Sequence, residues 1–236
     1  MDMIQTDKLV FEYDKRDEDG NIIGKSRAID EVDIDVKEGQ FIAILGHNGS
    51  GKSTFAKHIN ALLVPTDGTM WVDGRDTKDP NELWNVRQSA GMVFQNPDNQ
   101  IIGTVVEEDV GFGPENLGWD PAVIRRRVAE MASFFGIQTW FHREISTLSG
   151  GQRQLLALAA VMVLEPALLL LDEPTSQLDP IAAGDFLEMV QRINRELGTT
   201  ILLAEHRLAE AVPRSDRLLV LEGGQLLCQG TPREVG

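Results

Sequence analysis

Residues 46–53 have types and spacing that suit the binding of a phosphate chain, in the pattern G-x-x-x-x-G-K-S. The glycines let consecutive backbone N–H groups curl around phosphate oxygens at a helix N-terminus, where the helix dipole favours negative charge. In such a loop Lys52 reaches the β- and γ-phosphates, and the Ser53 hydroxyl is placed on Mg²⁺. The candidate nucleotide ligands in this stretch are Gly46, His47, Asn48, Gly49, Ser50, Gly51, Lys52, Ser53 and Thr54.

The flanks of this run decide between a phosphate-binding loop and a glycine-rich turn that only caps a helix. Residues 41–45 are all apolar, as in a buried strand, and residues 54–63 are typical of a helix. A strand, a loop and a helix in this order form the setting in which the motif binds phosphate. The sequence therefore predicts that the chain binds a nucleoside triphosphate.

Two adjacent carboxylates, Asp172 and Glu173, follow the apolar run 168–171. Phosphate chemistry needs one carboxylate near Mg²⁺ and another near the γ-phosphate to orient and polarise the attacking water. Asp172 suits the first role and Glu173 the second. A pair that only caps the next element is the alternative, and a phosphate loop upstream favours the catalytic interpretation.

The rest of the pattern predicts an α/β core with a mostly helical insertion near residues 96–160. An edge strand at 9–13, an acidic loop at 14–20 and alternating residues at 29–36 indicate a small antiparallel sheet before the phosphate loop. Further expected strands are 69–74, 91–95, 168–171, 200–204 and 218–221. Expected helices lie within 104–135, after Ser149, and at 180–196.

Composition narrows the function classes. The chain has 236 residues and a net charge of −15, so attraction to nucleic acid phosphate is not expected to drive binding. The single Cys228 excludes an internal disulfide, and its expected place is a late strand. No apolar stretch is long enough to span a bilayer and no signal peptide is evident, so any membrane association is expected to go through another protein.

Further short motifs give the chain a resemblance to the nucleotide-binding domains of ATP-binding cassette (ABC) proteins. Residues 148–152, Leu-Ser-Gly-Gly-Gln, match the signature motif of that family, and residues 176–179 resemble its D-loop. Gln95 ends a predicted strand like the Q-loop glutamine, and His206 follows one like the switch histidine. Tyr13 lies where the family has an aromatic residue that stacks on adenine. The matches occur in the order of the family and extend from about residue 4 to 232.

The resemblance implies a P-loop NTPase fold of the ABC type, with an N-terminal antiparallel β subdomain and a helical insertion subdomain. It implies one ABC ATPase domain over residues 1–236, with a RecA-like core at about 1–95 and 161–236 and the helical subdomain at about 96–160. Implied cofactors are ATP and Mg²⁺. The implied catalytic residues are Glu173, His206, Lys52 and Gln95, and the implied metal ligands are Ser53, Gln95 and Asp172.

The signature motif adds a second anion-binding surface, because a serine and two glycines begin a helix there. In the family this surface faces the γ-phosphate held by a second subunit, so the resemblance implies a head-to-tail dimer that closes on ATP. The residues implied to contact nucleotide across the dimer are Ser149, Gly150, Gly151 and Gln152. Asp179 is implied at the seam between subunits.

The long segment 94–118 resembles the energy-coupling factor (ECF) and cobalt-transport-type importer ATPases. That resemblance implies a peripheral subunit on the cytoplasmic face of the membrane that energises uptake of a vitamin or a transition-metal ion. Its implied partners are a second ATPase, identical or paralogous, a transmembrane scaffold protein and a separate substrate-binding membrane protein. ECF ATPases commonly carry a C-terminal extension, and this sequence reaches only the end of the nucleotide-binding core. Either the sequence is part of a longer protein, or its dimerisation depends on ATP and the scaffold, and the end of the sequence does not decide between these alternatives.

Three alternatives belong to other functional classes. A soluble ABC ATPase in DNA repair carries long coiled-coil insertions, and the interval from Lys52 to Ser149 shows no sustained heptads. Ribosome-acting members pair two cassettes in one chain, whereas this sequence holds one phosphate loop. A non-hydrolysing binding module is disfavoured by the presence of both Glu173 and His206. The ATPase of another ABC importer class stays open, and the sequence does not name the solute.

Overall fold

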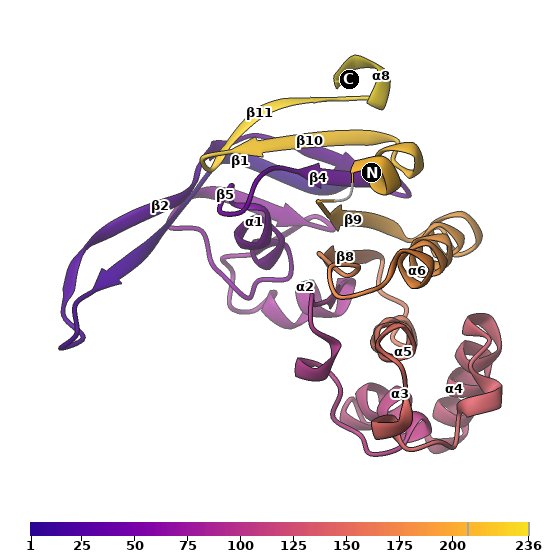
Figure 1. The fold of residues 1–236 in the computed structure, drawn as a ribbon. Helices are drawn as coiled ribbons and strands as arrows, with labels where there is room; N and C mark the ends of the chain where they lie inside the picture. Colours follow the sequence, from indigo (N-terminus) through magenta and orange to yellow (C-terminus); the bar gives the residue numbers. More distant parts are fainter. Residues whose placement is uncertain (207, 236) are drawn as a thin grey trace.

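The computed structural model describes residues 1–206 and 208–235, which form two sheets and a set of helices (Figure 1). The strands are β1 (Asp2–Arg16), β2 (Ile22–Val32), β3 (Asp35–Lys37), β4 (Phe41–Leu45), β5 (Asp67–Val72), β6 (Arg75–Asp76), β7 (Ala90–Val93), β8 (Leu168–Asp172), β9 (Thr200–Ala204), β10 (Arg217–Glu222) and β11 (Gln225–Gly230). The helices are α1 (Lys52–Ile59), α2 (Leu83–Ser89), α3 (Val106–Asn116), α4 (Pro121–Phe135), α5 (Gly150–Met162), α6 (Pro180–Arg192), α7 (Leu208–Ala211) and α8 (Pro232–Val235).

The six-stranded sheet carries the predicted phosphate loop. Its order is β11-β10-β4-β9-β8-β7, and β10 to β7 run parallel, while β11 pairs antiparallel at the edge. Every residue of β4, β8 and β9 is buried, which matches their continuous apolar sequences and the coverage of a parallel sheet on both faces. The register places Ile44 and Asp172 each beside Ala204, so these strands end at one edge. The predicted α/β P-loop core is confirmed.

The second sheet contains β2-β1-β5-β6, with β3 also on β1, and its pairs are antiparallel. The strand expected at 9–13 is part of the longer β1, in which residues up to Val10 pair with β3 or β5 and residues 9–16 pair with β2. Register shifts near Leu9 let its first part pair with β3 and β5 and its later part with β2. The expected loop at 14–20 begins only after Arg16, where the Asp17 carboxylate accepts the backbone N–H groups of Asp19 and Asn21.

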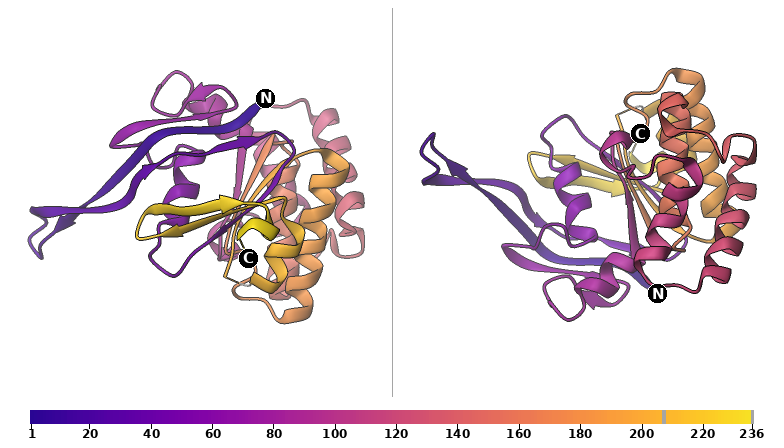
Figure 2. Two further views of the ribbon diagram at one scale, coloured as in Figure 1. Left: turned by 90° about the horizontal axis from the view of Figure 1, so that it is seen from above. Right: turned by 90° about the horizontal axis from the view of Figure 1, so that it is seen from below.

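The β1–β2 hairpin projects from the body of the protein, as Figures 1 and 2 show. Helix α1 packs on strands of both sheets. One apolar cluster joins Phe55 and Ile59 of α1 to Ile29 of β2 and Leu170 of β8. The helix ends at Ile59, earlier than the expected residue 63, since the chain turns through Asn60 and Ala61, the latter with φ +53°.

The helical region follows β7, and α5 lies between the parallel sheet and α3 and α4 (Figure 1). Asp120 caps α4 through the Ala122 N–H, and Gly136 ends it with φ +67°. One apolar cluster contains Phe135 of α4, Leu156 of α5 and Leu169 of β8. The division at residues 96 and 160 stays a prediction, since α5 continues to Met162 and shares its core with both parts.

The helix expected at 180–196 ends as α6 at Arg192 and continues as a π-helical turn over Ile193–Leu197. Short elements that the sequence pattern did not predict are α2, β6, α7 and α8. Cys228 lies on β11 and is exposed. Within the described ranges, no helix is both long and apolar enough to cross a lipid bilayer.

Candidate nucleotide site

The predicted phosphate loop leaves β4 at Leu45 and enters α1 at Lys52. Lys52 is only 4% exposed, and its Nζ donates to the carbonyl oxygens of Gly46 at 2.8 Å and His47 at 3.1 Å. The loop therefore closes around its own ammonium group. Both partners are neutral carbonyls, so a phosphate oxygen that displaces them would form a hydrogen bond in which donor and acceptor are both charged.

Gly51 shows why the loop needs glycine immediately before the lysine. Its φ is +106°, and a Cβ there would lie 2.7 Å from the carbonyl oxygen of Ala28 on β2. Gly224, in the β10–β11 turn, donates its N–H to the carbonyl of Ser50 at 3.0 Å. The phosphate loop is thus held between the turn and β2.

Ser53 and Asp172 lie in contact across the ends of α1 and β8. The Ser53 hydroxyl donates to Asp172 Oδ1 at 2.8 Å. Burial raises the pKa of the Asp172 carboxyl, the hydrogen bond from Ser53 opposes this, and the neighbouring Glu173 carboxylate raises the pKa further. A cation placed here would stabilise the ionised form of Asp172.

Glu173 contacts two groups that the sequence analysis assigned to catalysis. Its Oε1 lies 2.6 Å from His206 Nε2 and 3.7 Å from Lys52 Nζ. The backbone of Glu173 has φ +50°, uncommon outside glycine, and its N–H donates to the carbonyl of Ala204 at 2.8 Å. This turn points the carboxylate at the lysine and the histidine.

Gln95 and Tyr13 lie at two borders of this arrangement. Val93 pairs with Leu171, so Gln95, two residues beyond β7, occupies the position that matches Glu173 beyond β8. Gln95 is exposed. The Tyr13 hydroxyl lies 3.2 Å from Thr54 Oγ1, and its ring makes an edge contact with Phe11 at 4.8 Å between centroids. Tyr13 therefore stands beside the start of α1.

Comparison with known sequences identifies this arrangement. The profile of a family described as ABC transporter matches residues 29–176. The chain is 47% identical over 233 residues to the energy-coupling factor transporter ATP-binding protein EcfA1 of Clostridium perfringens strain 13, covering 99% of this chain and 81% of that protein. It is 52% identical over 208 residues to EcfA1 of Symbiobacterium thermophilum, covering 88% of this chain and 72% of the relative.

The chain belongs to the ABC transporter family. It is an ATP-binding cassette and an ATPase. Solved structures agree with this assignment. The cassette matches cbiO1 of Clostridium perfringens, described as part of the ABC transporter complex cbiONQ, with a TM-score of 0.88, 33% identity and coverage of 99% and 90% of the two chains. It matches a dimeric MJ0796 cassette bound to ADP and Pi with a TM-score of 0.83, 28% identity and coverage of 98% and 99%.

The signature residues of the cassette form the N-terminus of α5. Ser149 caps the helix, because its Oγ accepts the Gln152 N–H at 3.2 Å while Gln152 Oε1 accepts the Ser149 N–H at 2.9 Å. Ser149 and Gly150 are exposed. Asp179 caps α6 through the N–H groups of Ile181 and Ala182, both at 3.0 Å. The groups gathered around Lys52 lie just beyond the carboxyl ends of β4, β8 and β9, whereas the signature motif begins a separate helix.

Two residues that the sequence analysis did not select adjoin Glu173 and His206. Glu205, 1% exposed, accepts the Thr175 hydroxyl at Oε2 and the His206 N–H at Oε1. A glutamate before His206, at the end of an apolar strand, is the only sequence signal for this arrangement. Thr175 carries no signal beyond its place after Glu173.

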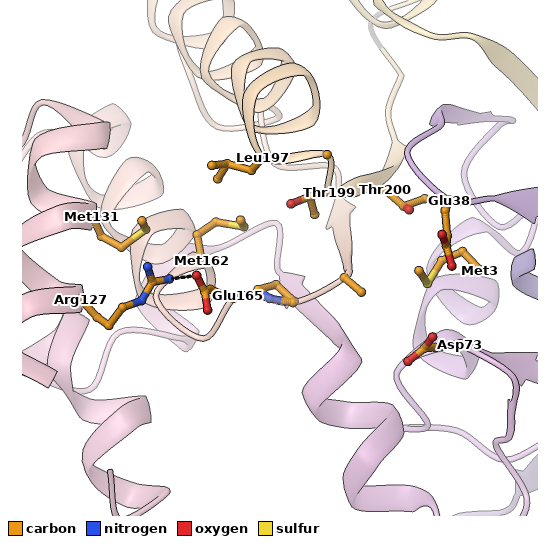
Figure 3. A pocket seen from close by; sticks show the side chains of 13 residues that line it. Met3, Glu38, Asp73, Arg127, Met131, Met162, Glu165, Leu197, Thr199 and Thr200 are labelled. Atoms are coloured by element: carbon orange, nitrogen blue, oxygen red, sulfur yellow. Dashed lines mark ion pairs between the residues drawn. The ribbon is translucent and has the colours of Figure 1, made fainter. Parts of the chain in front are cut away.

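A cavity of about 410 Å³ lies at the other edge of the sheet (Figure 3). Ala167 and Thr200 at the amino ends of β8 and β9 line it, together with Arg127 of α4, which pairs with Glu165. Because the phosphate loop is at the carboxyl ends of the strands, this cavity is separate from the candidate nucleotide site.

Proposed function

We propose that the cassette is the ATPase subunit of an ECF-type importer, in which ATP hydrolysis drives uptake of a vitamin or a transition-metal ion. The observation that carries the catalytic part is the contact of Glu173 with His206 at 2.6 Å beside the buried Lys52. The importer class is supported by EcfA1 relatives at 45–52% identity, whose names state that they are energy-coupling factor transporter ATP-binding proteins.

The nucleotide is expected along the phosphate loop, with the adenine ring on Tyr13. The backbone N–H groups of residues 46–54 donate to the phosphate oxygens, and Lys52 exchanges its two carbonyl partners for the β- and γ-phosphates. The aromatic contact with Phe11 and the hydroxyl contact with Thr54 hold the Tyr13 ring near α1. Binding thus needs little rearrangement of β1.

The hydroxyl of Ser53 and the carboxylate of Asp172 form a partly buried pair of oxygen groups. Mg²⁺ prefers such hard oxygen ligands, so this pair fits the ion. Gln95 supplies a further oxygen from the neighbouring strand end. Bound there, Mg²⁺ neutralises charge on the β- and γ-phosphates. In turn, the positive charge of the ion would favour the ionised Asp172 carboxylate and so oppose the rise in pKa that burial causes in the free protein.

Glu173 orients and polarises the water that attacks the γ-phosphate. In the free protein His206 Nε2 contacts the Glu173 carboxylate. In this proposal His206 donates a hydrogen bond to the γ-phosphate when ATP is bound and helps to hold the water. Lys52, 3.7 Å from Glu173, stabilises the charge that develops on the transferred group. These three side chains form the cis half of the catalytic site.

The trans half comes from a second cassette, identical or paralogous. Ser149, Gly150, Gly151 and Gln152 begin α5 with exposed or half-exposed residues, and this helix N-terminus suits the γ-phosphate held by the other subunit. Asp179 lies at the seam in this arrangement, where its capping contacts fix the start of α6. Loss of the γ-phosphate removes the bridge, and the dimer reopens.

On this proposal the cassette works on the cytoplasmic face of the membrane, with a transmembrane scaffold protein and a substrate-binding membrane protein. The test is purification through a tag on this chain from detergent extracts of its own cells. Recovery of polytopic membrane proteins, with ATP hydrolysis by the complex, is the expected result. Recovery of ribosomes or DNA-repair proteins without membrane proteins would overturn it.

A further inference from the structure

A buried carboxylate joins the D-loop segment to the switch histidine. The Thr175 hydroxyl donates to Glu205 Oε2 at 2.5 Å, and the His206 N–H donates to Glu205 Oε1 at 2.8 Å. Thr175 and Glu205 are 0% and 1% exposed. Hydrogen bonds to a carboxylate at this depth are stronger than neutral ones, and their loss is costly because water cannot replace them.

These contacts form a closed ring at the catalytic centre. Glu173 and Thr175 are two residues apart after β8, while Glu205 and His206 are adjacent after β9. One side-chain contact joins His206 to Glu173, and the other joins Thr175 to Glu205. The relative position of the two strand ends is therefore fixed twice, once by the catalytic pair itself and once by the buried pair behind it.

We propose that Glu205 is a positioning residue that holds His206 over Glu173 and makes the placement of His206 depend on the D-loop. This inference rests on the proposed function of Glu173 and His206. Thr175 begins the turn that leads into residues 176–179, and its carbonyl accepts the Leu178 N–H at 3.0 Å. A displacement of the D-loop at the subunit seam thus shifts Thr175, then Glu205, and then the backbone of His206.

The test removes the Thr175 hydroxyl without changing side-chain size, and uses the complex purified through a tag on this chain. Thr175→Val removes the donor to Glu205, and Thr175→Ser retains a hydroxyl. Thr200→Val is the matched control. Thr200 is 1% exposed and begins β9, the strand that Glu205 follows, and its Oγ1 accepts the Gly39 N–H at 2.9 Å, at the end of the strand away from Glu205. Each variant is assayed for kcat, for KM of Mg-ATP and for thermal unfolding.

We expect Thr175→Val to lower kcat by about tenfold, the effect of losing one hydrogen bond to a charged group, with KM changed less than about twofold. Thr175→Ser is expected to keep at least about half of the wild-type kcat, and Thr200→Val to keep kcat while lowering the unfolding temperature. Glu205→Gln should also lower kcat, because a neutral amide accepts the Thr175 hydroxyl and the His206 N–H less strongly than a carboxylate does. In a His206→Ala background, Thr175→Val should have no further effect on kcat.

Wild-type kcat in Thr175→Val, equal losses of kcat in Thr175→Val and Thr200→Val, or a full further loss in the His206→Ala background would each overturn the positioning role. Failure of the proposed function has a different signature. In that case Glu173→Gln hydrolyses ATP at the wild-type rate, whatever Thr175→Val does. An inactive Glu173→Gln beside a fully active Thr175→Val leaves the proposed function intact and removes only this inference.

Discussion

Replacement of Lys52 tests the phosphate loop most simply. In the free protein its buried ammonium donates to two loop carbonyls, and we expect those bonds to pass to phosphate oxygens when ATP binds. A hydrogen bond between charged groups contributes roughly 1.5–3 kcal/mol. Two such bonds, less the exchanged carbonyl contacts, give about 3 kcal/mol, so Lys52→Ala should weaken ATP binding at least about 100-fold.

The assay is an equilibrium titration with Mg-ATP, with thermal unfolding measured on the same samples. Lys78→Ala is the control, since Lys78 is half-buried and its Nζ, like that of Lys52, donates to a backbone carbonyl, that of Gly68, away from the phosphate loop. The control should bind ATP within about twofold of wild type. Binding by Lys52→Ala within threefold of wild type, in a folded sample, would refute the role of the ammonium group.

Three further substitutions test other parts of the site. Ser149→Arg should block ATP-induced dimerisation, measured by light scattering, while leaving ATP binding to the monomer intact. The control Ser146→Arg, at an exposed neighbouring position, should still dimerise. Dimerisation of Ser149→Arg would count against the trans contact. Asp172→Asn should raise the unfolding temperature of the free protein, because a buried carboxylate with a raised pKa is removed, and should abolish the Mg²⁺ dependence of ATP binding. Gly51→Ala should lower the free energy of unfolding in denaturant by about 3 kcal/mol, because Gly51 has φ +106° and a Cβ there would meet the Ala28 carbonyl. The control Gly184→Ala in α6 places its Cβ in open space and should not lower the free energy of unfolding.

The sequence predicts those features of the site that are encoded locally. The phosphate loop lies between an apolar strand and a helix because each of these is specified by its own run of residues, as are β8 with its terminal Asp172 and β9 before His206. Parallel pairing then brings their carboxyl ends to one edge. The meeting of Ser53 with Asp172 and of Glu173 with His206 follows from this topology.

Features that depend on pairing between distant residues could not be predicted. The neighbours of β1 depend on register shifts near Leu9, which no local pattern marks. The link from Thr175 to Glu205 joins residues 30 positions apart, and a buried glutamate in sequence is indistinguishable from an exposed one. Asp179 illustrates another limit, because its carboxylate caps α6 in the free cassette, and a role at the subunit seam needs a second chain.

The most direct test of the account is single-turnover cleavage of Mg-ATP by the purified complex carrying wild-type chain or Glu173→Gln. We expect the wild-type complex to release phosphate, and the variant to bind ATP with unchanged affinity and retain it uncut, because the carboxylate that contacts His206 and Lys52 is replaced by a neutral amide. Cleavage by the variant at the wild-type rate would contradict the assignment of this strand-end cluster as the hydrolytic centre.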